Sequence, residues 1–379
     1  MTKRIDIWHN ILWSRYKGGV FSALHKINDP TEFDIRFFQI AETEGNRSVL
    51  SAIDKSYHQY PYTLLFNGDF GRIGFWKRLW KIAIITAKSD AELSLLSGYE
   101  RPETWVQMLI IRAKRKKFML FCDSTLFDQP QGFIKGIVKK IIFRSADGML
   151  GYGERAKEYA LHYGVAPEKW HKRCQAAALP HDYTPETALS ERLRLAVPPE
   201  APRYLYVGRL SVEKNLCRLM EAFSVVLKTR PRASLAIIGN GSERSSLELY
   251  AKELGLNAKD IFLGSKSGKE LFDEYAKATC FVLPSISEPW GLVVNEALHY
   301  GCPVIVSERC GCVPELVIEG KTGLSHKAFD SSDLADKMLD ALNAFATKEK
   351  TAKNCLALMD KYTPNEAAKG IIGGIRNIV

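Results

Sequence analysis

The sequence lacks several features that would assign the protein to other classes. No run of about 18 uncharged apolar residues occurs, which argues against a spanning helix. Met1–His9 has no apolar core of signal-peptide length and is predicted to be a strand, so we expect a cytosolic protein. No Cys-x-x-Cys or His-x-x-x-His pair occurs, and no zinc site is expected. The eight cysteines are scattered along the chain, which is typical of a reducing compartment.

The first half of the chain has few acidic residues relative to its basic ones. Lys and Arg number 53 against 43 Asp and Glu, a net charge of +10. Residues 1–195 hold 30 basic and 21 acidic residues, a net of +9, whereas 196–379 hold 23 and 22, a net of +1. An acidic surface or partner is therefore expected to meet the first half. Nucleic acid is not the expected partner, because no nucleic-acid-binding module of known kinds is present.

Two windows in this basic half combine apolar and basic residues at helical spacing. Residues 131–144 have apolar residues on one side of a helix and basic ones on the other, the apolar set being Ile134, Ile137, Val138, Ile141 and Ile142. In residues 72–88, tryptophans and other apolar residues alternate with Lys and Arg. Such helices suit an anionic membrane surface. They equally suit helices that cover a sheet and solvate a basic face, so both interpretations stay open.

The length of 379 residues and the order of expected elements predict two α/β domains. Short apolar strands alternate with helical stretches, a pattern typical of a parallel sheet with crossover helices. In the first half these strands are Lys3–Trp8, Ile35–Ile40, Tyr62–Phe66, Leu93–Leu96, Phe118–Cys122 and Met149–Tyr152. A proline-rich polar stretch between about 185 and 202 is a reasonable linker. The next strand, Arg203–Val207, would begin the second domain.

Two glycines and a carboxylate lie where strands of the first domain are expected to end. Gly18 and Gly19 belong to a predicted turn, Tyr16–Val20, between the first strand and a helix. In a doubly wound fold this loop opens onto the ligand crevice, although a glycine pair also fits simple turn punctuation. Asp123 follows the strand Phe118–Cys122, where a carboxylate can act as a base or cap the next helix.

One stretch of the second half sets two carboxylates around a loop that becomes a helix. Phe281–Leu283 is predicted to be a buried strand, Glu288 lies in the loop, and Gly291 can bring its backbone close to a ligand. Leu292–Tyr300 has apolar residues at helical spacing, and the free N–H groups at its start suit an anion. Glu296, one turn into this helix, can accept hydrogen bonds from a ribose diol. As the alternative, Glu288 only solvates a loop and Glu296 complements the helix dipole.

Basic and glycine residues also mark the turns after two other strands. Arg209 and Lys214 stand five positions apart across the turn after Arg203–Val207. An Arg fork can grip two phosphate oxygens and a Lys adds a compact charge, although such a pair taken alone is usually solvated. Gly239 and Gly241 form a tight loop at the carboxyl end of the next strand, where this fold binds ligands.

The order of these motifs resembles that of the family 4 retaining glycosyltransferases. The resemblance rests on Gly208-Arg-Leu-Ser-Val-Glu-Lys-Asn215 after a strand, Ile237-Ile-Gly-Asn-Gly-Ser-Glu-Arg244, Glu288-Pro-Trp-Gly-Leu-Val-Val-Asn-Glu296, Gly311-Cys-Val-Pro-Glu315 and Gly320-Lys-Thr-Gly323. It covers the C-terminal half closely and the N-terminal half in outline. It implies two Rossmann-like doubly wound α/β domains that face each other across a cleft, the B-type glycosyltransferase fold.

The resemblance also implies a division of labour along the chain. Residues 1–190 would form an acceptor-binding domain and residues 200–360 a nucleotide-sugar-binding domain. Residues 361–379 would form a helix that crosses back to the first domain.

The same resemblance implies a donor site. Arg209 and Lys214 would bind the diphosphate of a nucleotide sugar, Glu288 the hydroxyls of its sugar and Glu296 its ribose. Arg209, Lys214 and Glu288 are the expected catalytic residues. The further donor-binding residues would be Gly18, Gly19, Gly208, Gly239, Gly241, Lys266, Gly291, Leu292 and Val293. No metal and no cofactor besides the donor substrate are expected, in agreement with the absence of an Asp-x-Asp pair.

The acceptor site departs from the family pattern. Many members carry a histidine after this strand of the first domain, where the present chain has Cys122 and Asp123. Either Asp123 makes the polar contact or the acceptor is held differently.

The expected reaction moves a sugar to a saccharide or lipid-linked saccharide with its configuration retained. We expect it in surface polysaccharide or lipopolysaccharide biosynthesis, in the cytoplasm or at the cytoplasmic face of the inner membrane. Alternatives are a sugar-nucleotide epimerase or phosphorylase on the same fold, or a non-catalytic basic binding module.

Overall fold

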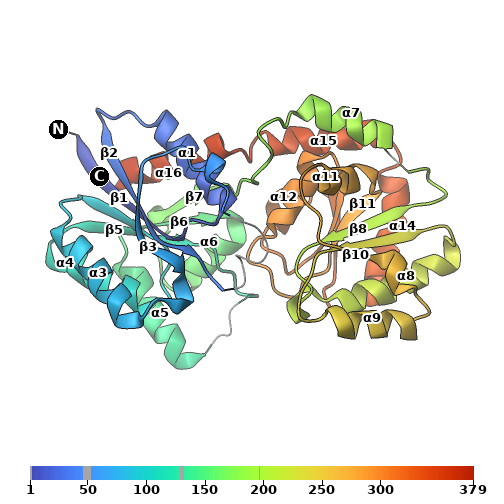
Figure 1. The fold of residues 1–379 in the computed structure, drawn as a ribbon, viewed down its shortest axis with the longest axis horizontal. Coiled ribbons are helices and arrows are strands. Elements are labelled where there is room, and N and C mark those ends of the chain that lie inside the picture. The colour runs from blue at the N-terminus through green and yellow to red at the C-terminus, as the bar shows by residue number, and fades with distance from the viewer. Residues whose placement is uncertain (1, 46–52, 129–131, 196) are drawn as a thin grey trace. The chain divides into compact units, whose positions relative to one another are not determined.

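Two compact units make up the chain in the computed structural model, which describes residues 2–45, 53–128, 132–195 and 197–379. The first unit comprises residues 1–126, 130–178 and 363–379, and the second comprises residues 127–129 and 179–362. Each unit is a sheet with helices packed on it (Figure 1).

The first unit is built on a seven-stranded sheet in which every neighbouring pair is parallel, in the order β3-β2-β1-β4-β5-β6-β7. The strands are β1 (Lys3–Ile11), β2 (Phe33–Thr43), β3 (Tyr62–Asp69), β4 (Leu93–Leu96), β5 (Lys117–Cys122), β6 (Gly148–Tyr152) and β7 (Trp170–Arg173). The predicted parallel sheet is confirmed. β7 was not predicted, because Trp-His-Lys-Arg is short and mostly polar.

Helices cover both faces of this sheet. Because side chains alternate along a strand, Ile7 of β1 packs in one apolar cluster and Trp8 in the other. The Ile7 face is covered by α1 (Arg15–Ile27) and α16 (Pro364–Ile378). The Trp8 face is covered by α3 (Phe75–Lys88), α4 (Pro102–Ala113), α5 (Phe133–Ser145) and α6 (Gly153–His162). Short 3-10 turns are η1 (Lys55–Tyr57), η2 (Phe70–Arg72) and η3 (Pro167–Lys169).

The second unit repeats the plan with a six-stranded parallel sheet in the order β10-β9-β8-β11-β12-β13. Its strands are β8 (Arg203–Val207), β9 (Ser234–Ile238), β10 (Phe262–Gly264), β11 (Cys280–Leu283), β12 (Val304–Ser307) and β13 (Gly323–His326). Its helices are α7 (Pro185–Leu195), η4 (Val212–Lys214), α8 (Leu216–Thr229), α9 (Arg244–Glu253), α10 (Ala258–Ile261), α11 (Gly268–Lys277), α12 (Leu292–His299), α13 (Val313–Leu316), α14 (Ser331–Ala344) and α15 (Lys348–Met359). The predicted Rossmann-like architecture is present in both units.

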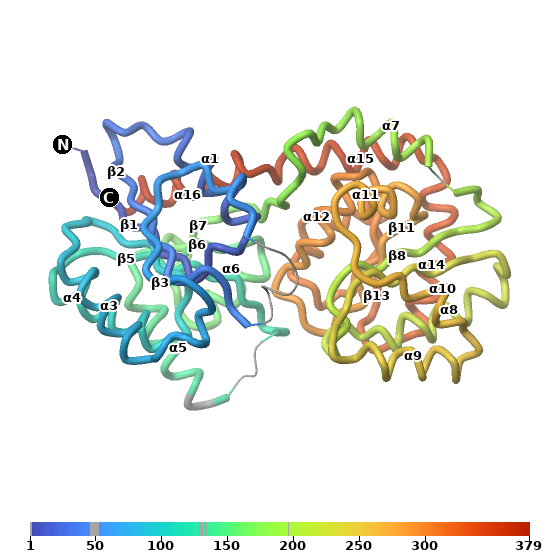
Figure 2. Tube along the Cα trace, in the orientation of Figure 1, coloured from blue at the N-terminus to red at the C-terminus, as the bar shows by residue number. Residues whose placement is uncertain are grey.

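The two units divide at residues 178 and 179, earlier than the proline-rich stretch suggested. α7 lies before that stretch but packs on α11 and α15 of the second unit. Its buried Arg192 donates a 3.0 Å hydrogen bond to Ala276 O at the end of α11. At the other end, α16 packs on α1 and β7, so the last helix belongs to the first unit. Figure 2 shows α16 beside α1.

Both sheets contain a point at which the strand order reverses. It lies between β1 and β4 in the first unit and between β8 and β11 in the second. In open α/β sheets, ligands bind outside the carboxyl ends of the strands at this switch point. Each unit therefore offers one place where a site is expected.

The helix α5 packs on the sheet but does not bury all of its apolar residues there, as the sheet-covering interpretation would require. Ile137, Val138 and Ile141 are 48%, 39% and 65% exposed, whereas Lys139 Nζ donates to Tyr159 Oη at 2.7 Å. Part of the apolar stripe therefore faces outward and one of the lysines faces inward. The side chain of Ile134 lies outside the described residues. Within the ranges that the structure describes, no helix combines the length and apolarity needed to cross a membrane.

Candidate functional site

The loops after β8, β9 and β10 are fastened together at the carboxyl edge of the second sheet. Gly208 N donates to Ile238 O at 3.0 Å, and Gly239 N donates to Gly264 O at 2.8 Å. These backbone bonds hold two of the predicted donor-binding glycines near the switch point of this unit.

Backbone packing requires glycine at three of these positions. A Cβ on Gly239, whose φ is +137°, would lie 1.9 Å from Gly208 O. A Cβ on Gly241 would lie 2.2 Å from Leu210 O, and one on Gly208 would lie 2.7 Å from Tyr206 Oη. The three glycines therefore let the loops close on each other. Their contact with a donor stays a prediction.

Lys214 and Glu288, 74 positions apart in sequence, form an ion pair. Lys214 Nζ contacts Glu288 Oε2, and the two side chains are only 11% and 17% exposed. The turn that carries Lys214 is attached to the loop that carries Glu288, because Asn215 Nδ2 donates to Pro284 O at 3.1 Å. The structure thus brings together two of the three predicted catalytic residues.

Arg209, the third, lies in the same loop as Lys214 but is 66% exposed. Its Nη2 donates to Glu213 Oε1 at 3.2 Å, and Ser211 Oγ donates to the same oxygen at 2.7 Å. Burial would raise the pKa of the Glu213 carboxyl, but the Ser211 hydrogen bond and the charges of Arg209 and Lys214 lower that pKa on balance. Arg209 is thus held by Glu213 rather than by Glu288.

The start of α12 depends on Gly291, whose φ is +99°. A Cβ at this position would lie 2.9 Å from Leu283 Cδ2 and 3.4 Å from Glu288 Cγ. The next residues, Leu292 and Val293, open the helix, and a helix leaves its first N–H groups without intrahelical partners. Such a helix start attracts anions. It lies directly after the loop that holds Glu288.

Glu296 lies one turn into α12 and accepts a hydrogen bond from Tyr275 Oη at 3.2 Å. Burial raises the pKa of the Glu296 carboxyl to about 7, although the Tyr275 hydrogen bond acts in the opposite direction. The group therefore titrates near neutral pH. The predicted ribose contact would favour its ionised form, which accepts hydroxyl hydrogen bonds on both oxygens.

Lys266 is engaged in an ion pair within the second unit. Its Nζ lies 2.6 Å from Glu274 Oε1, and Glu274 also pairs with Arg203 of β8. The side chain therefore helps to attach the loop after β10 to α11. A contact between this loop and a nucleotide base stays a prediction.

The predicted glycine turn at Tyr16–Val20 is wrong, because these residues lie inside α1. Gly18 N donates to Ser14 O at 2.9 Å and so continues the helix. A Cβ on Gly18 would lie 2.7 Å from His58 Cε1, which explains this glycine by packing. A Cβ on Gly19 would have only Pro364 Cγ near it, at 3.9 Å. A role for either glycine in donor binding stays a prediction.

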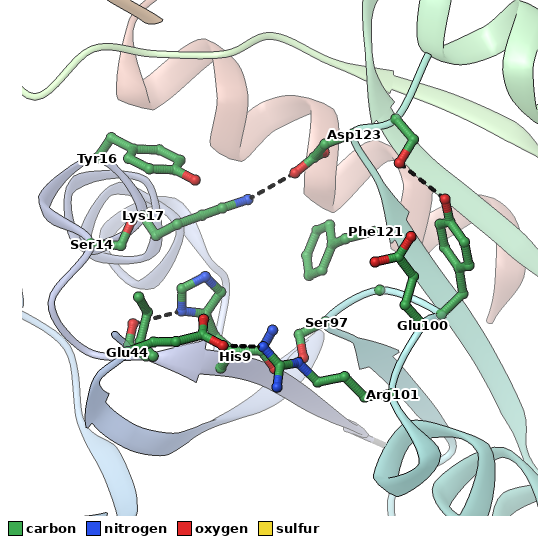
Figure 3. Close-up of a pocket in the computed structure, with 15 residues that line it drawn as sticks. His9, Ser14, Tyr16, Lys17, Glu44, Ser97, Glu100, Arg101, Phe121 and Asp123 are labelled. Carbon is green, nitrogen blue, oxygen red and sulfur yellow. Dashed lines mark hydrogen bonds and ion pairs between the residues drawn. The ribbon is translucent and has the colours of Figure 1, made fainter. Parts of the chain in front are cut away.

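The first unit has a pocket of about 390 Å³ at its own switch point. Residues from the carboxyl ends of β1, β4 and β5 and from the start of α1 line it, and Asp123 is among them (Figure 3). Asp123 Oδ1 accepts from Arg173 Nη2 at 2.9 Å, and its Oδ2 lies 3.9 Å from Lys17 Nζ. The carboxylate is therefore held between two cations.

Lys17 and Arg173 were not identified from the sequence. Their side chains are only 6% and 1% exposed. Burial lowers the pKa of Lys17 to about 7, the charge of Arg173 adds to this effect and that of Asp123 opposes it. Lys17 Nζ donates to Tyr152 Oη at 2.9 Å. A lysine directly before a glycine pair was the available signal for Lys17, whereas Arg173 in a short polar strand has none.

Comparison with known proteins finds a family similarity within the second unit. A family model described as "Glycosyl transferases group 1" matches residues 190–355. The sulfoquinovosyl transferase SQD2 of Arabidopsis thaliana is 36% identical over 43% of this chain, and the match covers only 31% of that relative. The chain therefore spans less than a third of the length of this relative.

A second relative extends the similarity into the first unit. The D-inositol 3-phosphate glycosyltransferase of Corynebacterium aurimucosum is 30% identical over 71% of this chain and 67% of its own length. The chain belongs to the group 1 glycosyltransferases. Membership in this family agrees with the resemblance of the motifs that contain Lys214, Glu288 and Gly291.

Solved structures resemble this group 1 glycosyltransferase over nearly the whole length of its chain. Anabaena HepE, solved in complex with UDP and glucose, has a TM-score of 0.71 with 16% sequence identity, over 99% of both chains. At this identity the likeness shows the fold alone. It confirms the predicted B-type glycosyltransferase fold.

Proposed function

We propose that the protein transfers a sugar from a nucleotide diphosphate sugar to a hydroxyl group of a saccharide or lipid-linked saccharide. The observation that carries this proposal is the Lys214–Glu288 ion pair beside the start of α12, in a chain of the group 1 glycosyltransferase family. The pair supplies a cation for a diphosphate and a carboxylate for sugar hydroxyls within one ion-pair distance. HepE, which shares the fold, was solved with UDP and glucose, which supports a nucleotide-sugar donor.

The chemistry requires stabilisation of a departing diphosphate. As the bond between the sugar C1 and the diphosphate oxygen breaks, negative charge accumulates on the diphosphate and positive charge on the sugar ring. Lys214, Arg209 and the first N–H groups of α12 are fixed donors for that negative charge, which is electrostatic catalysis by groups already in position. Because these groups provide the positive charge, the reaction as proposed requires no divalent metal ion.

We propose retention of configuration through front-face attack. The acceptor hydroxyl bonds to C1 on the face from which the diphosphate leaves, and its proton passes to the departing diphosphate oxygen. A double displacement would instead need a free carboxylate nucleophile. Asp123, the candidate carboxylate of the first unit, is engaged by Arg173 and lies near Lys17, which suits a fixed hydrogen-bond acceptor. A glycosyl adduct trapped on Asp123, together with loss of turnover in Asp123→Ala, would contradict front-face attack.

The experiment that tests the function starts from a thermal-shift screen of UDP-, GDP- and ADP-sugars, since a bound ligand raises the apparent stability. The nucleotide sugar with the largest shift is then incubated with and without a panel of saccharides, and the anomeric configuration of the product is read by NMR. We expect consumption that depends on the saccharide and a retained anomer. Epimerised sugar or phosphate-dependent release from the donor alone would instead identify an epimerase or a phosphorylase. Binding without any consumption would leave only a binding module.

The finer proposal is an acceptor at an anionic membrane, in surface polysaccharide or lipopolysaccharide synthesis. It is supported by α3, where Trp76 and Trp80 are 67% and 65% exposed next to Lys77, and by Leu109 of the adjoining α4, which is 70% exposed. Amphipathic helices with tryptophan and lysine favour anionic lipid surfaces. We expect flotation with vesicles that contain phosphatidylglycerol but not with pure phosphatidylcholine vesicles. Trp76→Ala together with Trp80→Ala should abolish flotation, and equal flotation with both vesicle types would rule out the proposed charge preference.

A further inference from the structure

The second unit has a pocket between α7 and α11, two helices that pack on each other (Figure 1). Its walls come from the loop at residues 180–184, from one face of each helix and from Tyr300, directly after α12. The volume of about 460 Å³ is within the range of about 300–1,000 Å³ that is typical of small-molecule pockets. None of the predicted donor-binding residues, all of which the structure describes, lines this α7–α11 pocket. A ligand there would therefore be additional to the donor.

Three aromatic rings form part of the walls of the α7–α11 pocket. Phe272 of α11 stacks on Tyr300 with ring centroids 4.6 Å apart, and Tyr183 meets Tyr300 edge-on at 5.7 Å. Tyr183 Oη donates to His299 O at 2.7 Å, which fixes the position of this ring. Phe272 and Tyr183 are only half-buried, so they offer ring surface to a ligand. The aromatic walls are therefore formed by contacts within the protein before any ligand binds.

Carboxylates from three elements surround these rings. Asp182 belongs to the loop before α7, Glu191 to α7 and Asp273 to α11. Glu191 is paired with Arg194, and Asp273 lies 2.9 Å from Lys269 Nζ, whose side chain is 74% exposed. Asp182 is exposed and has no ion-pair partner among the residues that the structure describes. One carboxylate of the lining is thus not compensated by a cation.

The neighbouring charged groups leave an excess of negative charge. Arg192 of α7 donates to Ala276 O at 3.0 Å, next to the pocket wall. Burial raises the pKa of the Tyr183 hydroxyl, and the nearby charges of Asp360 and Glu186 raise it further. The lining groups and these neighbours together give three cations against five carboxylates, a net charge of −2, namely Lys269, Arg192 and Arg194 against Asp182, Glu186, Glu191, Asp273 and Asp360.

Aromatic walls with an excess of carboxylates favour one class of ligand. A cation within about 6 Å of an aromatic ring is attracted by the negative face of the ring, and the carboxylates add coulombic attraction. Phosphate and carboxylate groups are repelled by the same field. A bare metal ion would need several converging ligand side chains, and no such group of three occurs in the part of the chain that the structure describes. The pocket therefore suits a positive charge that carries its own apolar groups.

We propose that the α7–α11 pocket binds an organic ammonium ion. The rings of Tyr183, Phe272 and Tyr300 contact the carbon atoms around the charge, and Asp182 supplies the carboxylate that no cation of the protein occupies. This inference goes beyond the proposed transferase function and does not depend on it.

The test is a saturation-transfer NMR titration of the intact chain with probes of matched shape and different charge. The first series is choline, its neutral isostere 3,3-dimethylbutan-1-ol, and 3,3-dimethylbutanoate. The second series is 2-phenylethylammonium, 2-phenylethanol and phenylacetate. We expect at least one ammonium probe to bind at least tenfold more tightly than its neutral counterpart, and the carboxylate of that series to bind most weakly.

A charge-reversal variant locates the bound probe. Asp182→Lys, at an exposed loop position, should weaken the ammonium probe at least tenfold, change the neutral probe less than twofold and tighten the carboxylate probe. Asp340→Lys is the matched control, because Asp340 is 62% exposed and lies on α14, which packs on α8 and β13. This control should change the affinity of every probe less than twofold.

A second variant tests the aromatic contact. Phe272→Leu keeps an apolar side chain but removes a ring, and it should weaken choline about fivefold while 3,3-dimethylbutan-1-ol changes less than twofold. Urea unfolding of the variant checks that the second unit is folded.

Four results would each overturn the inference. They are failure of all ammonium probes to bind, equal affinities for the ammonium and neutral probes, equal effects of Asp182→Lys and Asp340→Lys, and unchanged choline affinity in Phe272→Leu. Consumption of a nucleotide sugar is measured without these probes, so none of the four results affects the transferase proposal.

Discussion

At the carboxyl edge of the second sheet, Lys214 and Glu288 come from two loops and neutralise each other in a single pair. At the same edge of the first sheet, Asp123 follows β5 and is held by Lys17 of α1 and Arg173 of β7. Residues in loops with glycines and prolines leave a local pattern in the sequence. Residues that reach a site from the face of a helix or from inside a strand leave a weaker pattern: only the glycine pair marks Lys17, and nothing marks Arg173.

The buried titratable groups at the two edges also change the stability of their units in opposite directions as the pH rises. Burial raises the pKa of Glu296 to about 7 and lowers that of Lys17 to about 7. Between pH 4.5, the ordinary pKa of a Glu carboxyl, and pH 7, the folded state keeps a proton on Glu296 that the unfolded state releases. This group therefore lowers the stability of the second unit as pH rises. Between 7 and 10.5 the unfolded state keeps a proton that folded Lys17 releases, so this group raises the stability of the first unit as pH rises.

The largest effect is expected from removing Lys214, the cation at the carboxyl edge of the second sheet. Lys214→Met should reduce kcat/KM by about 100- to 1,000-fold, because a fixed donor to the departing diphosphate is lost. The measurement is turnover of the selected nucleotide sugar. Lys269→Met, which removes an exposed lysine of the same unit, should change turnover less than twofold.

This variant also leaves Glu288 without its partner, so stability has to be separated from catalysis. The double variant Lys214→Met, Glu288→Gln removes the uncompensated carboxylate and should recover most of the stability but none of the turnover. Recovery of turnover in the double variant would show that the pair has only a structural role.

The loop packing at the second edge predicts a large effect on stability. Gly239→Ala should destabilise the second unit by about 2–4 kcal/mol, because the new Cβ would lie 1.9 Å from Gly208 O at a strained φ. Urea unfolding followed by near-UV circular dichroism measures this change. Gly373→Ala, in α16 with open space around it, is the control and should stabilise the first unit by about 0.5–1 kcal/mol. A neutral effect at Gly239 would mean that the loops do not pack as described.

The buried cations of the first edge predict a smaller effect. Asp123→Asn should cost the first unit about 1–3 kcal/mol, because Lys17 and Arg173 lose their carboxylate while Asp123 itself is partly exposed. Nucleotide-sugar affinity should stay within twofold. Asp90→Asn, at an exposed carboxylate of the same unit, should change stability by less than about 0.5 kcal/mol. Equal effects of the two variants would remove the distinction between the buried and the exposed cluster.

The smallest expected effect is on the pH dependence of donor binding. If the donor ribose requires ionised Glu296, a group with pKa about 7 makes binding about tenfold tighter at pH 8 than at pH 6. Isothermal titration with an intact nucleotide sugar measures this ratio without interference from the terminal phosphate of a free nucleotide. Glu296→Gln should bind with the same affinity at both pH values. A pH dependence that persists in Glu296→Gln would assign the titration to another group.

Much of the architecture followed from local patterns. The strands Leu93–Leu96 and Arg203–Val207 have the predicted bounds, and α12 begins at the predicted Leu292. Short apolar runs between helical stretches can bury both faces only in a parallel sheet covered by helices, so the fold class was accessible. The helical conformation of Gly18 and Gly19 was not accessible, because a glycine that avoids the His58 ring inside a helix looks in sequence like one that makes a turn.

The sequence by itself determined the two Rossmann-like units, the loop residues Arg209, Lys214 and Glu288, and the glycine at the start of α12. Only the tertiary structure decided that Lys214 pairs with Glu288, that Arg209 is held by Glu213, and that Lys17 and Arg173 surround Asp123. The reason is physical: periodicity and turn chemistry act over a few neighbouring residues. Ion pairs and burial depend on which distant segments the folded sheet brings to the same edge.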